Sequence, residues 1–114
     1  MDQLINDLDN STKGALYGKV ALVTGASRGI GYAIADALAQ SGADIAISSS
    51  SSANLEQAKR KLSSHGGKVY PCPANLLDVQ APKRMIQEVI RHFGKLDILV
   101  NNAGIAIPKP LTDT

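Results

Sequence analysis

The chain has 114 residues, about the length of one ordinary domain, and 44% of them are hydrophobic, which is enough to form a core. Charged residues make up 19% and the formal net charge is +2, which argues against global disorder and against nucleic acid as the main partner. Aromatic residues make up only 4%, so a surface for stacking bases is not expected.

The amino-terminal segment, residues 1–17, is expected to be a polar arm and not a targeting signal. It carries Asp2, Asp7 and Asp9, and no apolar run precedes Val20. No stretch of the chain approaches the roughly 18 consecutive apolar residues that a membrane span needs. We therefore expect a cytoplasmic protein that has no membrane partner.

The first expected strand, 20–24, leads into a glycine-rich turn and then into a helix over 29–41. The strand is a short apolar run, typical of a parallel sheet buried on both faces. A Cβ at Gly25, Gly29 or Gly31 would keep the backbone of the turn away from a phosphate. In this order of elements, the amides and the positive dipole end of the helix face a bound diphosphate. A tight turn without a ligand is the alternative.

The apolar positions of this helix recur at i, i+3, i+4, i+7 and i+8, a spacing that predicts its buried face. These positions are Ile30, Ala33, Ile34, Ala37 and Leu38. Gly42 follows, where glycine commonly ends a helix.

A second strand is expected at 45–47, and five consecutive serines, Ser48 to Ser52, follow it. A flexible linker is the simplest interpretation of a serine run. Such a linker rarely lies at the mouth of a nucleotide site, so we also consider that these hydroxyl groups bind a ligand.

The remaining elements continue the alternation of helices and strands. Helices are expected over 53–64 and 79–93, and strands over 68–74 and 96–100. Asp78 is the expected N-cap of the second of these helices.

The single cysteine, Cys72, excludes an intramolecular disulfide, and it has no Cys or His at metal-ligand spacing. Its position between Pro71 and Pro73 indicates a small buried hydrophobic side chain. A reactive thiol is the alternative. No metal site is predicted, and neither His65 nor His92 is assigned a catalytic role.

The alternation β-α-β-α-β-α-β predicts an α/β fold, a partial Rossmann-like doubly wound parallel sheet with strand order 3-2-1-4. The nucleotide is expected at the carboxyl ends of the first and fourth strands, where the strand order reverses. We assign residues 18–107 to this partial NAD(P)-binding domain, 1–17 to the arm, and 108–114 to an irregular end.

Two motifs separated by two βα units resemble those of one family. Thr24-Gly25-x3-Gly29-Ile30-Gly31 matches its cofactor motif, and Asn101-Asn102-Ala103-Gly104 matches its second motif. Gly94-Lys95-Leu96-Asp97, leading into the fourth strand, is also typical of it. On these motifs, residues 16–107 resemble the N-terminal half of the short-chain dehydrogenase/reductase family.

The resemblance implies which residues lie beside the cofactor. The first motif would hold the pyrophosphate, through Gly25, Ser27, Arg28, Gly29, Ile30 and Gly31. The second motif would line the adenine-ribose side through Asn102, Ala103 and Gly104. A purely structural role for Asn101 and Asn102 as turn formers is the alternative.

The choice between NAD and NADP depends on the end of the second strand, where an NAD site usually has an Asp or Glu that binds the ribose 2′-hydroxyl. Here Ser48 and Ser49 occupy this place, and Asp44 lies at the amino end of the strand. Members of the family with an arginine at the position of Arg28 use it to bind the 2′-phosphate, for which a planar guanidinium is suited. NADP is therefore expected over NAD. A solvated loop charge is the alternative role of Arg28.

The adenine contact departs from the family pattern. After the third strand the family usually has Asp followed by an aliphatic residue, whereas this chain has Asn75 before Leu76. An amide oxygen can still accept a hydrogen bond from the adenine amino group. We expect a weakened contact at Asn75 and Leu76.

The catalytic Ser and Tyr-x-x-x-Lys of the family are not found, so no catalytic residue is assigned. The fourth residue after Tyr17, Tyr32 and Tyr70 is never lysine, and the chain stops just past the fourth strand. We expect the cofactor-binding part of an NADP-dependent oxidoreductase that transfers hydride to or from a small carbonyl or alcohol. The fragment alone is expected to be inactive, and the full-length parent to be a homo-oligomer. The alternatives are a non-enzymatic nucleotide-binding or interaction protein and a structural domain without a ligand.

Overall fold

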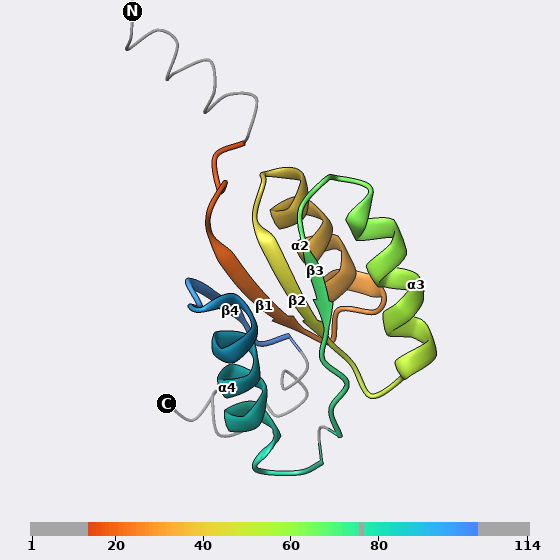
Figure 1. The fold of residues 1–114 in the computed structure, drawn as a ribbon. Coiled ribbons are helices and arrows are strands. Elements are labelled where there is room, and N and C mark those ends of the chain that lie inside the picture. Colours follow the sequence, from red (N-terminus) through yellow and green to blue (C-terminus); the bar gives the residue numbers. More distant parts are fainter. Residues whose placement is uncertain (1–13, 76, 103–114) are drawn as a thin grey trace, which may run out of the picture.

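The computed structural model describes residues 14–75 and 77–102. Its centre is a four-stranded sheet with the strand order β3-β2-β1-β4, and every neighbouring pair is parallel (Figure 1). The strands are β1 (Val20–Thr24), β2 (Asp44–Ser48), β3 (Val69–Pro71) and β4 (Ile98–Val100). The predicted partial doubly wound α/β fold and its strand order are confirmed.

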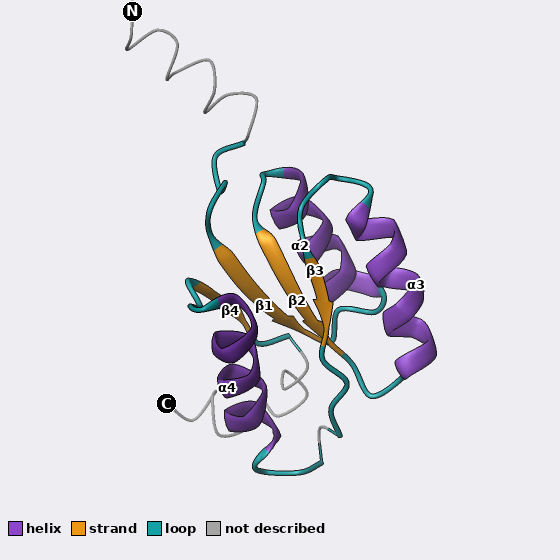
Figure 2. Ribbon diagram, viewed as in Figure 1, coloured by secondary structure: helices purple, strands orange, loops and turns teal. Residues whose placement is uncertain are grey.

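The helices form a layer on each face of the sheet (Figure 2). On one face lie α2 (Gly29–Gln40) and α3 (Ser52–Ser63), and α4 (Ala81–Phe93) lies on the other. Residues of β1 alternate between the two resulting cores, because successive side chains of a strand point to opposite faces. Ala21 and Val23 pack with α2 and α3, whereas Leu22 packs with α4.

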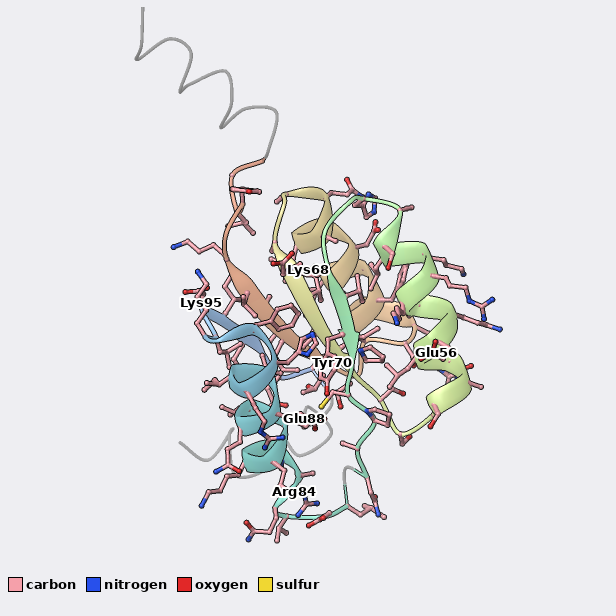
Figure 3. The ribbon with its side chains drawn as sticks, viewed as in Figure 1. Glu56, Lys68, Tyr70, Arg84, Glu88 and Lys95 are labelled. Carbon is pink, nitrogen blue, oxygen red and sulfur yellow. The ribbon has the colours of Figure 1, made fainter. Side chains whose placement is uncertain are left out.

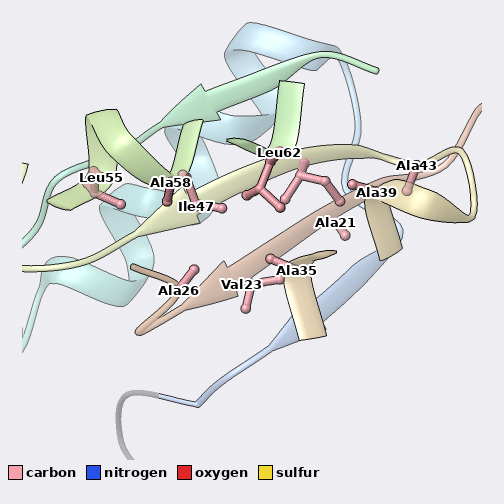
Figure 4. Close-up of a cluster of buried hydrophobic side chains, with 11 residues drawn as sticks. Ala21, Val23, Ala26, Ala35, Ala39, Ala43, Ile47, Leu55, Ala58 and Leu62 are labelled. Carbon is pink, nitrogen blue, oxygen red and sulfur yellow. The ribbon is translucent and has the colours of Figure 1, made fainter. Parts of the chain in front are cut away.

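The larger core lies between the sheet and the pair α2–α3. Ile45 and Ile47 of β2 are fully buried there against Leu55 and Leu62 of α3 (Figure 4). By contrast, α2 contributes mainly small side chains. Because these residues are small, α2 lies close to the sheet. This close packing fixes the position of its N-terminus.

The predicted buried face of α2 was wrong. The buried positions are Gly31, Ala35 and Ala39, whereas Ile30 is 73% exposed. Of the five residues of the predicted face, only Leu38 packs against the larger core. The physical reason is that α2 is apolar around much of its circumference, so hydrophobic spacing does not determine which face packs inward.

Three predicted boundaries also need correction. Helix α4 begins at Ala81, not at residue 79, and its N-cap is Gln80. The predicted N-cap, Asp78, lies before the helix, where its Oδ1 accepts from the backbone N–H of Gln80 at 2.9 Å. The strands β3 and β4 are shorter than the predicted 68–74 and 96–100.

Asp97, which directly precedes β4, bonds to β1 through both its side chain and its backbone. Its Oδ2 accepts from the backbone N–H of Val20 at 2.8 Å, and its own N–H donates to the carbonyl of Val20 at 2.9 Å. The N–H of Val20 lowers the pKa of this carboxyl, since the bond favours the ionised form. Asp97 therefore attaches the start of β4 to β1.

A polar cluster lies beneath α4 on the second face of the sheet. Tyr70 of β3 and Glu88 of α4 point toward each other, and the phenol donates to the carboxylate at 2.6 Å (Figure 3). The ring of Tyr70 also stacks on His92 at a centroid distance of 4.0 Å. The hydrogen bond to Glu88 is the main cause that raises the pKa of Tyr70 to about 12.

The thiol of Cys72 belongs to the same cluster and is almost completely buried, with 1% of its surface exposed. Its Sγ donates to Glu88 at 3.4 Å. Burial, together with the charge of Glu88, raises the pKa of Cys72 to about 12. The prediction of a small buried side chain is confirmed, and nothing here activates the thiol.

We therefore expect Cys72 to resist alkylation in the folded protein. At pH 8 the thiol is protonated and enclosed, so iodoacetamide should modify it about 100-fold or more slowly than in denaturant. Mass spectrometry of timed samples measures this ratio, and the denatured chain is the control, since Cys72 is its only cysteine. Similar rates with and without denaturant would contradict the buried position.

Candidate functional site

The carboxyl ends of three strands meet at one edge of the sheet. The register pairs Thr24 with Ser48 and Val23 with Val100, so the segments that follow β1, β2 and β4 begin side by side. The strand order reverses between β1 and β4, since the chain proceeds from β1 through β2 to β3 and then returns to β4 on the opposite side. In open parallel sheets this switch point is where ligands bind.

The glycine turn between β1 and α2 is built for close approach of an anion. Gly29 has a φ of +65°, and a Cβ added to it would meet nothing within 4 Å, so its outer side is open. Arg28 is the N-cap of α2 and makes no side-chain capping bond. The start of a helix, with backbone amides pointing outward, is a ready site for phosphate.

Two asparagines that directly follow β4 bond to the turn and to the strand before it. The side-chain amide of Asn102 donates from Nδ2 to the carbonyl of Gly25 at 3.3 Å. A Cβ at Gly31 would overlap this same carbonyl and lie 2.8 Å from that Nδ2. Asn101 accepts at Oδ1 from the hydroxyl of Thr24 at 3.3 Å. Both asparagines therefore join β4 to the end of β1, and the residues present fit a diphosphate held by backbone groups.

Hydrogen bonds hold the serine run in place. It is therefore not the flexible linker that its composition alone suggests. The hydroxyl groups of Ser27 and Ser49 lie 3.1 Å apart, and the Ser49 Oγ accepts from the backbone N–H of Ser51 at 3.2 Å. Ser51 is the N-cap of α3, where its hydroxyl accepts from the N–H of Asn54 at 3.2 Å. The run thus connects the glycine turn to the start of α3.

Ser48 is the unusual residue of this run. It is fully buried at the end of β2, and its Oγ has no hydrogen-bond partner among the residues that the structure describes. A buried hydroxyl without a partner costs free energy. This orphaned oxygen lies at the edge where the sequence predicts the ribose.

The end of β2 carries no carboxylate. Asp44 is the first residue of β2, at the opposite edge, where its Oδ1 accepts from the N–H of Lys68 at 3.0 Å. Arg28, in contrast, is exposed at the ligand edge. A guanidinium at this edge suits an anion such as a phosphate.

Of the residues predicted to contact the adenine, Asn75 is the one whose position the structure describes. Asn75 is exposed, and its Oδ1 accepts from the backbone N–H of Leu77 at 3.0 Å, so one lone pair of the expected adenine acceptor is already used. Leu76, Ala103 and Gly104 lie outside the described residues.

Two cavities lie near the sheet. A cavity of about 240 Å³ adjoins the glycine turn and is lined by Ser27, Arg28, Gly29 and Tyr32 and, from α3, by Gln57 and Lys61. A larger one of about 490 Å³, which includes Asp44 and His65, lies at the amino ends of the strands. We take the smaller cavity as part of the site because it adjoins the carboxyl edge.

Sequence reasoning missed Tyr32, Gln57 and Lys61. The spacing of Gln57 and Lys61 at i and i+4 does place them on one face of α3, but only the packing of α3 beside α2 brings that face to Arg28.

Other kinds of site find no support in the part of the chain that the structure describes. No group of three or more His, Cys, Asp or Glu residues there is placed to hold a metal ion. Of the described helices, none has both the length and the apolar character to cross a membrane.

Comparisons with known proteins agree with the fold. The family model for short chain dehydrogenase matches residues 19–114. A hydroxynaphthalene reductase of Aspergillus fumigatus is 45% identical over 100 residues, which are 87% of this chain but only 37% of that protein. The chain thus spans little more than a third of the length of this relative.

Solved structures with the same arrangement include two reductases. A dehydrogenase/reductase from Sinorhizobium meliloti is 41% identical with a TM-score of 0.74, over 78% of this chain and 36% of its own. L-sorbose reductase from Gluconobacter frateurii, solved in complex with NADPH and L-sorbose, is 38% identical with a TM-score of 0.74, over 81% of this chain and 35% of its own. This chain therefore belongs to the short-chain dehydrogenase family.

Proposed function

We propose that this chain binds NADP(H) and forms the cofactor-binding portion of a reductase that acts on a small carbonyl or alcohol. The proposal rests on the arrangement of residues at the carboxyl edge of the sheet. There a glycine turn, closed by Asn102, lies beside the exposed guanidinium of Arg28, and β2 ends without a carboxylate. A pyrophosphate and a 2′-phosphate fit this combination of backbone amides and positive charge.

Each group at the edge has a distinct task in this proposal. Backbone amides of the turn from Gly25 to Gly31 bind the pyrophosphate, and Arg28 binds the 2′-phosphate. Ser49 is held by Ser27 and Ser51, so its hydroxyl is oriented before the ligand arrives. When bound, the nicotinamide supplies the hydride for reduction of a carbonyl or accepts it from an alcohol.

The relatives support this assignment without extending it to a substrate. L-sorbose reductase, of which this chain matches about a third, was solved in complex with NADPH and L-sorbose. The three tyrosines of this chain are followed four residues later by Ala21, Asp36 and Ala74, so none forms a Tyr-x-x-x-Lys pair. We propose that these 114 residues provide cofactor binding, and that turnover needs a general acid they do not contain.

Calorimetric titration with NADPH and with NADH tests the proposal directly. We expect NADPH to bind about tenfold or more tightly than NADH, since only NADPH carries the 2′-phosphate that Arg28 recognises. Carbonyl reduction by the chain alone should not rise above background. Equal affinity for the two nucleotides would contradict the NADP assignment, and failure of both to bind would contradict the site.

A further inference from the structure

The larger of the two cavities lies at the amino ends of the strands, at the edge of the sheet opposite the glycine turn. Its volume of about 490 Å³ is within the range of roughly 300–1,000 Å³ that sites for small molecules occupy. We propose that this cavity is a second binding site and that its ligand is a small zwitterion. The class includes α-amino acids, which carry one carboxylate and one ammonium group.

Three neighbouring strands frame the cavity where they begin (Figure 1). The N–H of Asp44 donates to the carbonyl of Lys19 at 2.9 Å, and the N–H of Ile45 donates to that of Lys68 at 2.9 Å. These bonds hold the starts of β1, β2 and β3 beside one another, and Lys68 marks this end of the sheet in Figure 3. The lining residues are Tyr17, Gly18, Gly42, Asp44, His65, Gly66, Gly67 and Lys68.

The walls of the cavity are largely bare backbone, since four of its eight lining residues are glycines. A Cβ added to Gly18 or to Gly66 would meet nothing within 4 Å, so the space beside them is open. Tyr17 supplies the aromatic ring of the lining. A molecule the size of an amino acid therefore has room to enter.

Two opposite charges, those of Asp44 and Lys68, line this space without pairing. Within the described chain neither forms an ion pair. Oδ1 of Asp44 accepts from the backbone N–H of Lys68 at 3.0 Å, which holds the carboxylate in place and leaves Oδ2 for a ligand. His65 also lines the cavity, but its Nε2 is already bonded to Asp36 at 2.7 Å.

This pair of charges determines the class of ligand. An ion of one sign is attracted by one wall of the cavity and repelled by the other, whereas a zwitterion gains from both. An ammonium group suits the carboxylate of Asp44, and a carboxylate suits the ammonium group of Lys68. The inference does not depend on the proposed function, because the nucleotide belongs at the opposite edge of the sheet.

Nuclear magnetic resonance titration of the full 114-residue chain tests the inference, since the lining glycines provide amide signals inside the cavity. The probe is L-phenylalanine. Hydrocinnamate, which lacks its ammonium group, and phenethylamine, which lacks its carboxylate, are the matched probes. We expect L-phenylalanine to bind with a Kd of about 1 mM and to shift the glycine signals. Each matched probe should bind about threefold to tenfold more weakly, because one screened charge contact is lost.

Two variants remove one charge each. Asp44→Asn keeps an acceptor for the N–H of Lys68, and Lys68→Gln alters an exposed side chain. Each should weaken L-phenylalanine about threefold to tenfold. Lys83→Gln, at an exposed position of α4 that does not line the cavity, is the control and should bind as the unmodified chain does. Circular dichroism checks that each variant is folded, and Lys68→Gln is sufficient if Asp44→Asn is not.

Equal affinity for the three probes would overturn the assignment of a zwitterion. Absence of shifts at the lining glycines, up to the solubility limit of L-phenylalanine, would overturn the site, and so would an unchanged affinity in the folded variants. Binding of NADPH is followed separately, at the amide signals of Gly29 and Gly31. Failure of the nucleotide to bind therefore contradicts the proposed function and leaves this test intact.

Discussion

Replacing Gly31 by alanine is expected to destabilise the fold and to abolish nucleotide binding together. An added Cβ would overlap the carbonyl of Gly25 and lie 2.8 Å from Nδ2 of Asn102. Neither neighbour can yield easily, since one is backbone and the other joins β4 to the turn. We expect a loss of about 3 kcal/mol in the free energy of unfolding, typical of severe overpacking. Urea denaturation measures this loss, and calorimetry measures the affinity for NADPH.

The matched comparison is Gly29→Ala, in the same turn. A Cβ at Gly29 meets nothing within 4 Å, so the substitution is strained only by its φ of +65°. It should cost about 1 kcal/mol in stability, yet it should weaken NADPH strongly because the new methyl group occupies the open side of the turn. Equal effects of the two substitutions on stability would show that the close approach at Gly31 is not what holds the turn.

Reversing the charge of Arg28 is expected to remove the preference for NADPH without unfolding the protein. Arg28→Glu replaces a bidentate donor to phosphate by a carboxylate that repels it, so affinity for NADPH should fall about 100-fold or more. The loss for NADH should be much smaller, since NADH has no 2′-phosphate. Titration of both nucleotides at low salt, where exposed charges are least screened, provides the measurement.

Stability should not fall in this variant. Arg28 is exposed, and its side chain makes no capping bond to α2. A glutamate at this N-cap is near the positive end of the helix dipole, which favours it. Arg60→Glu on α3 is the control for a change of net charge alone. A parallel loss of NADPH affinity in both variants would assign the effect to overall charge and not to recognition by Arg28.

The strand order and the glycine turn could be predicted because their signals are local in the sequence. Each strand is a short, mainly apolar run, and alternation with helices leaves few topologies. The exposed position of Ile30 could not be predicted in this way. Apolar residues occur on several sides of α2, and only the close packing of Gly31, Ala35 and Ala39 on the sheet determines its rotation.

Of the candidate site, the glycine turn could be predicted because its motif lies within one turn of the chain. Arg28 follows from its place in the glycine motif, whereas Lys61 lies 33 positions further along and on another helix. Its place beside Arg28 depends on how α3 packs against α2, which spacing within either helix does not encode. The bond of Ser49 to Ser27 was missed for a similar reason, since a run of identical residues does not indicate which member is oriented.

The small residues that bury α2 are separate from Arg28, the exposed residue proposed to bind the cofactor. Gly31, Ala35 and Ala39 hold the helix against the sheet, whereas Arg28 is exposed. If Arg28 binds the 2′-phosphate as proposed, substitutions at this position change the preferred cofactor with little effect on the melting temperature. Folding and the proposed choice of cofactor then depend on different positions of the same strand-turn-helix unit.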